Sequence, residues 1–166
     1  MTTKRITAIA MVAAIYAVLT TGLGIISYGP IQIRFAEILN LLAYFNPVFI
    51  FAVTLGTFIA NMFSPYGLLD MIIGTSASFI SLVLVWFTGK INNMFLASFW
   101  PVIINAVMIS FLILIATETE ITFISFAGFA ATVGAGQFIV MILMAYPLFK
   151  FLTLKHERII EMIRNI

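Results

Sequence analysis

Cysteine is absent from this chain of 166 residues, histidine occurs once, and only 8% of the residues are charged. Without cysteine the chain has no disulfides, no thiolate metal ligands and no cysteine nucleophile. The net charge of +2 is too small and too dispersed to indicate a nucleic-acid partner. Soluble domains carry charge on about a quarter of their residues. So few charges exclude a soluble globular protein.

Apolar residues are abundant: 63% of the chain is hydrophobic and its mean hydropathy is +1.20. This composition indicates an integral membrane protein, in which a spanning helix needs roughly 20 apolar residues. We predict an all-α membrane protein with a single domain at residues 1–166, folded as a compact bundle of six transmembrane helices. The predicted helices cover residues 6–26, 34–46, 47–63, 68–88, 94–116 and 123–152, and a tail with a short amphipathic helix covers residues 153–166.

Lysine and arginine are unevenly distributed among the segments that connect these helices. If both termini are inside, seven basic residues lie on the cytoplasmic side and Arg34 alone lies outside. The seven are Lys4, Arg5, Lys90, Lys150, Lys155, Arg158 and Arg164. Cytoplasmic loops carry an excess of Lys and Arg. The sequence therefore predicts a multi-pass protein of the cell membrane with both termini in the cytoplasm.

Polar side chains at membrane depth are rare and usually face a cavity or a neighbouring helix. The candidates are Arg34, Glu37, Asn61, Asp70, Asn105 and Gln137. Four of them flank the two predicted outer turns at residues 27–30 and 64–67, and the other two lie near the middle of their helices. Together they predict a polar pocket that opens to the outside.

Each of these residues also has a purely structural interpretation. Arg34 and Glu37 are three residues apart and on one helix face would pair with each other, or reach the lipid headgroups. Asp70 lies near the start of its helix, where a carboxylate offsets the helix dipole. The three amides would form hydrogen bonds between helices.

Small residues recur one turn apart in the first predicted helix, at Ala10, Ala13, Ala14 and Ala17. This spacing lets another helix approach closely. The stripe therefore predicts either a docking surface for a partner or packing among the chain's own helices.

No pattern in the sequence supports catalysis. The single histidine, His156, lies in the tail and lacks the second histidine of a zinc-protease motif. No Gly-x-x-x-x-Gly-Lys phosphate loop occurs. We predict that the protein is not an enzyme and holds no metal or cofactor, and that any ATP-driven function requires a partner.

Two segments carry a family resemblance. The first is Gln32-Ile33-Arg34-Phe35-Ala36-Glu37, and the second runs over residues 59–70 and is followed by Gly74. Together with residues 101–106, they resemble the queuosine-precursor transporter (QueT) family. The resemblance extends from about residue 8 to residue 152.

The resemblance implies the substrate-binding S component of an energy-coupling factor (ECF) importer. Such a protein has six helices in the lipid bilayer and binds a micronutrient on the outer side. It works with a transmembrane coupling subunit and ATPase subunits, which would supply the motor that this sequence lacks. The alanine stripe would then dock on the coupling subunit.

The ligands that the resemblance implies are 7-deazaguanine compounds. Asp70 or Glu37 would accept hydrogen bonds from the N–H groups of a guanine-like edge or meet an aminomethyl cation. Arg34 or an asparagine would donate to the ring carbonyl. Phe35 and Tyr66 would stack on the base, or else anchor the chain at the membrane interface.

One residue departs from the expected family pattern. Gly136 is followed by Gln137 where we expect a Gly-Glu pair. The amide can still hydrogen-bond a ligand, but it cannot neutralise a cation. This difference leaves open which precursor is bound. Two alternatives also stay open: an S component for a different vitamin-like ligand, and a structural membrane subunit whose polar residues only hold its helices together.

Overall fold

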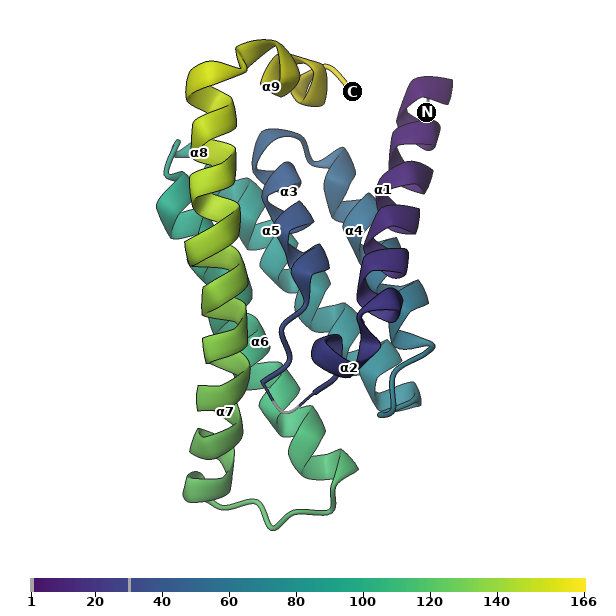
Figure 1. Ribbon diagram of the computed structural model, residues 1–166, viewed down its shortest axis with the longest axis vertical. Helices are drawn as coiled ribbons and strands as arrows, with labels where there is room; N and C mark the ends of the chain where they lie inside the picture. Colours follow the sequence, from purple (N-terminus) through teal and green to yellow (C-terminus); the bar gives the residue numbers. More distant parts are fainter. Residues whose placement is uncertain (1, 30) are drawn as a thin grey trace.

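The computed structural model describes residues 2–29 and 31–166, and the described chain is built from helices and short connections (Figure 1). Met1, where the predicted domain begins, and Pro30, which belongs to a predicted turn, lie outside the described residues. The α-helices are α1 (Thr3–Gly22), α2 (Gly24–Ser27), α3 (Leu42–Phe45), α4 (Val48–Asn61), α5 (Thr75–Lys90), α6 (Met94–Ala116), α7 (Phe123–Phe138), α8 (Tyr146–Lys155) and α9 (Glu157–Arg164). A 3₁₀ helix, η1 (Phe35–Leu41), leads into α3, and two π-helical segments, η2 (Asp70–Gly74) and η3 (Ile139–Ala145), join their neighbours into longer helices.

Four helical segments are long and apolar enough to cross a membrane. They are Thr3–Gly22, Asp70–Lys90, Met94–Ala116 and Phe123–Lys155, and two shorter apolar helices cover Phe35–Phe45 and Val48–Asn61. Large apolar side chains such as Val18 and Phe51 are exposed on the outside of the bundle, as expected where the surroundings are lipid. The predicted all-α membrane class is confirmed.

Helix boundaries differ from the prediction at the start of the chain. The first helix begins at Thr3 and ends at Gly22, whereas residues 6–26 were expected as one helix. Leu23 leaves the helical conformation, with φ −105° and ψ 30°, between two glycines that disfavour helix. A separate short helix, Gly24–Ser27, follows. The second predicted helix is also mostly a 3₁₀ helix, over Phe35–Leu41.

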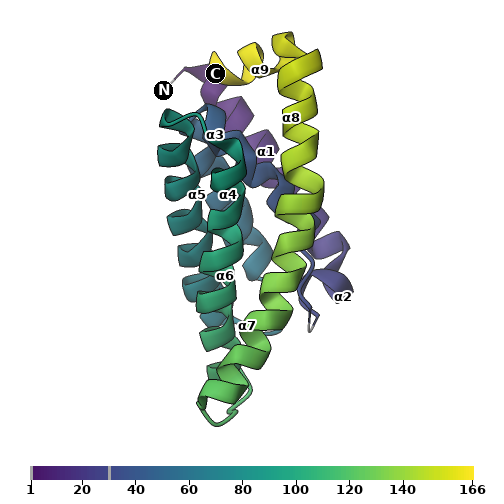
Figure 2. The ribbon, with the colours of Figure 1, turned by 90° about the vertical axis from the view of Figure 1, so that its left-hand side faces the viewer.

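Both ends of the chain lie at the same end of the bundle (Figure 1). There the Arg5 side chain donates to the carbonyl oxygen of Ile166 over 2.6 Å. Helix α9 lies across this end, with Ile160 buried and Asn46 donating to the carbonyl oxygens of Ile163 and Arg164. A helix in the tail is therefore confirmed. Figure 2 shows the α6–α7 connection at the opposite end.

The alanine stripe of α1 is divided between two environments. Ala13 and Ala17 are buried, whereas Ala10 and Ala14 are exposed. The buried side meets Gly56 of α4, where an added Cβ would lie 2.7 Å from Tyr16 Cβ and 2.8 Å from the Ala13 carbonyl oxygen. Half of the stripe thus serves packing within the chain, and the other half faces outward.

Replacing Gly56 with alanine is expected to lower stability. The new Cβ would be closer to the backbone of α1 than van der Waals contact allows, and such overpacking costs about 1–3 kcal/mol. The better helix propensity of alanine offsets this cost by no more than about 1 kcal/mol. Thermal unfolding in detergent measures the change. Gly22→Ala, which has open space around it, is the control; an equal effect of both variants would contradict close α1–α4 packing.

Candidate functional site

An ion pair joins the loop before η1 to the start of η2. Arg34 Nη2 lies 3.0 Å from Asp70 Oδ2, and the two side chains are only 4% and 0% exposed. Arg34 has extended backbone, with φ −97° and ψ 94°, and directly precedes the first turn of η1. Asp70 is the first residue of η2. A buried charge requires such a partner, because removal from water costs several kcal/mol for each ion.

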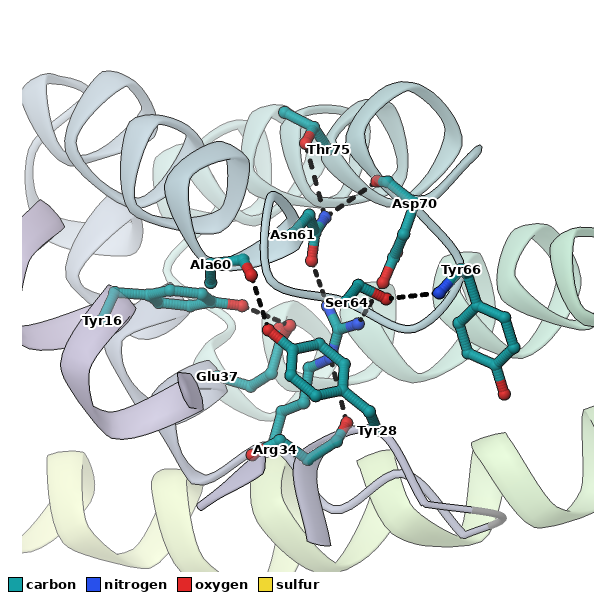
Figure 3. Close-up of polar contacts among 11 residues, drawn as sticks. Tyr16, Tyr28, Arg34, Glu37, Ala60, Asn61, Ser64, Tyr66, Asp70 and Thr75 are labelled. Carbon is teal, nitrogen blue, oxygen red and sulfur yellow. Dashed lines mark hydrogen bonds and ion pairs between the residues drawn. The ribbon is translucent and has the colours of Figure 1, made fainter. Parts of the chain in front are cut away.

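Asn61, the last residue of α4, connects the two charged residues (Figure 3). Its Oδ1 accepts a hydrogen bond from Arg34 Nη1 over 3.2 Å. Its Nδ2 donates to the Asp70 carbonyl oxygen over 2.9 Å and to Thr75 Oγ1 over 3.4 Å. The predicted proximity of Arg34, Asn61 and Asp70 is therefore confirmed, and these contacts hold three separate segments together.

The loop that carries Arg34 is fastened to α4 by a tyrosine. Tyr28 donates its hydroxyl to the carbonyl oxygen of Ala60 over 2.6 Å. The guanidinium carbon of Arg34 lies 5.2 Å from the centre of the Tyr28 ring, within the range of a cation–π interaction. Arg34 Nε also donates to the Ser27 carbonyl oxygen over 3.3 Å. Arg34 is thus held by contacts on several sides.

Glu37 forms hydrogen bonds with other residues, next to the cluster of Arg34, Asn61 and Asp70. Tyr16 of α1 donates its hydroxyl to Glu37 Oε1 over 2.8 Å, and Asn40 donates to Oε2. Among the described residues, the ion pair of Arg34 is formed with Asp70. The interpretation in which Arg34 and Glu37 pair with each other is therefore wrong.

Several buried polar atoms near these segments have no hydrogen-bond partner within the described chain. Three of them are the acceptors Asp70 Oδ1 and Gln137 Oε1 and the donor Gln32 Nε2, and two more are Ser27 Oγ and Asn40 Oδ1. Gln32 has a left-handed backbone, with φ 51°, and Gln32 and Gln137 are each 3% exposed. A buried polar group without a partner costs about 1–3 kcal/mol. Such atoms are candidates for contact with a ligand.

Gly136 brings α7 against the loop that carries Gln32. A Cβ added to Gly136 would collide with the Ile31 carbonyl oxygen and lie 3.1 Å from the Gln32 carbonyl oxygen. Gln137 is therefore next in sequence to a residue that contacts this loop. Gly74, the last residue of η2, is similarly close to its neighbours, because a Cβ there would collide with Asp70 Oδ1 and lie 2.9 Å from Asn61 Nδ2.

The other predicted site residues form no described hydrogen bond with Arg34 or with the Asp70 side chain. Asn105 is buried on α6, and no described hydrogen bond joins it to Arg34 or Asp70. Phe35 is half-buried at the start of η1. Tyr66 packs against an apolar cluster formed with α6 and α7, and its ring points away from Arg34 in Figure 3. Burial raises the pKa of the Tyr66 phenol and the nearby Asp70 carboxylate adds to the increase, so the hydroxyl stays protonated at neutral pH.

A family model described as "QueT transporter" matches residues 6–154. The chain belongs to the QueT transporter family. A relative in Lactococcus lactis subsp. cremoris (strain MG1363), the "Queuosine precursor transporter QueT", is 46% identical over 84 residues. The match covers 49% of this chain and 49% of the relative, so it spans about half the length of either. No solved structure matches the chain. The resemblance that the sequence showed to the QueT family is confirmed.

Sequence reasoning missed several residues of the site in this QueT family member. Asn40 follows Glu37 by three residues in an otherwise apolar segment, and this spacing was a signal that the two side chains interact. Gln32 belongs to the segment that carries the family resemblance, but nothing in that segment showed that its amide is buried. Tyr16 lies within a long apolar helix, and only the tertiary structure brings its hydroxyl to Glu37.

Proposed function

We propose that the chain is the substrate-binding membrane subunit of an ATP-driven ECF importer and binds a queuosine precursor of the 7-deazaguanine type from the outer side. Membership of the QueT transporter family supports transport. The name of the relative from Lactococcus lactis, a queuosine precursor transporter, supports the class of substrate. A sequence without a phosphate loop supports a motor in separate ATPase subunits.

The proposal rests on one observation, which is that one oxygen of the Asp70 carboxylate has no partner in the described part of the chain. Arg34 balances its charge through Oδ2, while Oδ1 remains without a partner among the described residues. A carboxylate held in this way accepts hydrogen bonds without leaving an isolated charge in the membrane. Its free oxygen suits the N–H donors on the edge of a guanine-like base.

The two glutamines complete a complementary set of groups. Gln137 Oε1 is a second acceptor and Gln32 Nε2 is a donor, both buried and without a described partner. A guanine-like edge presents adjacent N–H donors beside a carbonyl acceptor, which matches two acceptors and one donor. In our proposal these atoms converge on the base. Because Arg34 and Asp70 are buried, ligand entry requires residues 31–34 or 64–69 to move.

The same cluster also supports a second candidate, a structural membrane subunit. Arg34, Asn61 and Asp70 tie a loop, α4 and η2 together by contacts within the chain alone. In that case the polar residues only stabilise the bundle. Ligand binding distinguishes the two candidates, because a structural subunit shows no ligand-dependent thermal shift.

Calorimetry on the purified chain, without ATP, tests the proposal with 7-aminomethyl-7-deazaguanine as the probe. We expect binding, and we expect Gln137→Leu to weaken it by about tenfold, since one lost hydrogen bond to a ligand costs on the order of 1.4 kcal/mol. Ala135→Leu, an exposed position on the same helix, is the control. If the folded protein does not bind the probe, the proposed substrate is wrong. Unchanged affinity of Gln137→Leu removes that residue from the site.

The proposed partners require a docking surface and an orientation. We propose that six helical segments cross the bilayer, with both termini in the cytoplasm and the exposed Ala10 and Ala14 against the coupling subunit. Ala13, which contacts Gly56 of α4, and the buried Ala17 would support that surface from inside. Uptake of labelled precursor by cells should require the coupling and ATPase subunits. Uptake with this chain alone would contradict the proposal.

A further inference from the structure

A hollow lies at the end of the bundle where the termini are found. Its volume is about 280 Å³. The end of α3, the α5–α6 connection and α8 form its walls, and these segments all lie toward the termini in Figure 1. The polar residues that line it are Tyr44, Asn92, Asn93, Tyr146, Lys150 and Thr153.

Each of the two asparagines that line this hollow uses its side-chain oxygen in a hydrogen bond within the chain. Asn92 Oδ1 accepts a hydrogen bond from the Tyr44 hydroxyl over 3.1 Å. Asn93 Oδ1 accepts one from the backbone N–H of Leu96 over 2.9 Å, as the cap of α6. The NH₂ groups of the two side chains have no acceptor among the described hydrogen bonds and remain as donors for a ligand.

A lysine gives the hollow a positive charge. Lys150 Nζ donates to the Tyr146 hydroxyl oxygen over 3.2 Å, which leaves the hydroxyl proton of Tyr146 free to donate elsewhere. No aspartate or glutamate is among the residues that line the hollow. A cation and a surplus of donors without a carboxylate select for an anion.

The first turn of α6 adds backbone donors. Within the described hydrogen bonds, the N–H groups of Met94 and Phe95 have no acceptor, while those of Leu96 and Ala97 bond to Asn93. Helix α6 is 23 residues long, and the start of a helix carries a partial positive charge. Such an N-terminus together with a lysine is a common arrangement for binding phosphate.

The apolar residues of the hollow indicate whether the phosphate belongs to a lipid or to a soluble anion. Phe95 and Leu154 line the hollow and are 48% and 72% exposed. On a membrane protein these exposed side chains contact acyl chains, and an end of the bundle meets the headgroup layer. We propose that this hollow binds the phosphate of an anionic phospholipid headgroup, in a site separate from the Arg34 cluster.

Native mass spectrometry of the purified chain tests this proposal, with phosphatidylglycerol or phosphatidylcholine added at equal concentration. We expect retained phosphatidylglycerol to exceed phosphatidylcholine by about fivefold, from a single lysine at the headgroup layer. Lys150→Gln should remove the preference. Lys155→Gln, on the same helix but outside the hollow, should keep it. If the two variants had the same preference for phosphatidylglycerol over phosphatidylcholine, the proposed site would be wrong.

A second variant guards against a folding defect in the first. Asn92→Asp keeps the shape of the residue and its acceptor for Tyr44, and aspartate tolerates the left-handed backbone at this position, with φ 56°. Its added negative charge should abolish the phosphatidylglycerol preference without lowering the melting temperature. A preference that survives this change would overturn the proposal. The proposal would also be overturned if inorganic phosphate raised the melting temperature as much as phosphatidylglycerol does, because the ligand would then be a soluble anion.

Discussion

Replacing Asp70 with asparagine is expected to lower the stability of the protein strongly and to abolish binding of 7-aminomethyl-7-deazaguanine. Asparagine has the same shape but no charge, so Arg34 would remain buried at 4% exposure without its counter-ion. Leaving one member of a buried ion pair unpaired costs about 3–5 kcal/mol. Thermal unfolding in detergent measures the loss of stability, and calorimetry measures binding. Glu118→Gln, an exposed carboxylate elsewhere in the chain, is the matched control and should change neither.

A double variant separates the structural role of Asp70 from its proposed contact with the ligand. Arg34→Met with Asp70→Leu removes both charges, and a buried ion pair replaced by apolar side chains is often neutral or stabilising. We expect the double variant to regain most of the stability that Asp70→Asn loses, yet still to bind no ligand. If it bound the ligand normally, Asp70 would not belong to the binding site. If it were as unstable as Asp70→Asn, the unpaired charge would not be the cause.

The sequence predicted the fold best where strong local signals mark the ends of a helix. Helix α6, Met94–Ala116, coincides with the prediction because Asn93 caps its start and a polar loop follows its end. The 3₁₀ geometry of Phe35–Leu41 carries no such signal. It depends on how closely the segment packs against its neighbours, which apolar composition alone does not determine. The break at Leu23, between Gly22 and Gly24, had a local signal in the two glycines.

The proximity of three candidate residues was predictable, but their pairings were not, and at 0–4% exposure they do not form the expected pocket open to the outside. Topology placed Arg34, Asn61 and Asp70 near one another, and the contacts among them confirm it. The Arg34–Glu37 alternative required both residues on one helix face, whereas Arg34 lies in extended backbone before the helix begins. The side chain is therefore free to turn toward η2. No spacing in the sequence shows that Glu37 meets Tyr16, since 21 residues separate them.

Replacing Gly136 with alanine is the second change for which we expect a large effect. A Cβ at this position would collide with the Ile31 carbonyl oxygen and crowd that of Gln32. Both obstacles are backbone atoms, so rotating a side chain cannot relieve the clash. Either α7 or the loop must shift, and overpacking of this kind costs about 1–3 kcal/mol. We expect a lower melting temperature and affinity for the ligand reduced by more than about tenfold, because a displacement of ~1 Å is enough to break a hydrogen bond.

Two other glycines of α7 provide the controls for this variant. A Cβ at Gly134 would make ordinary contact with Ala106 Cβ at 3.5 Å, and one at Gly128 would enter open space. Alanine at either position should preserve both stability and affinity. If Gly136→Ala bound the ligand normally while losing stability, the contact between α7 and the loop would be structural only. Lost affinity with near-normal stability would instead mean that this contact sets the position of Gln32 and Gln137 against the base.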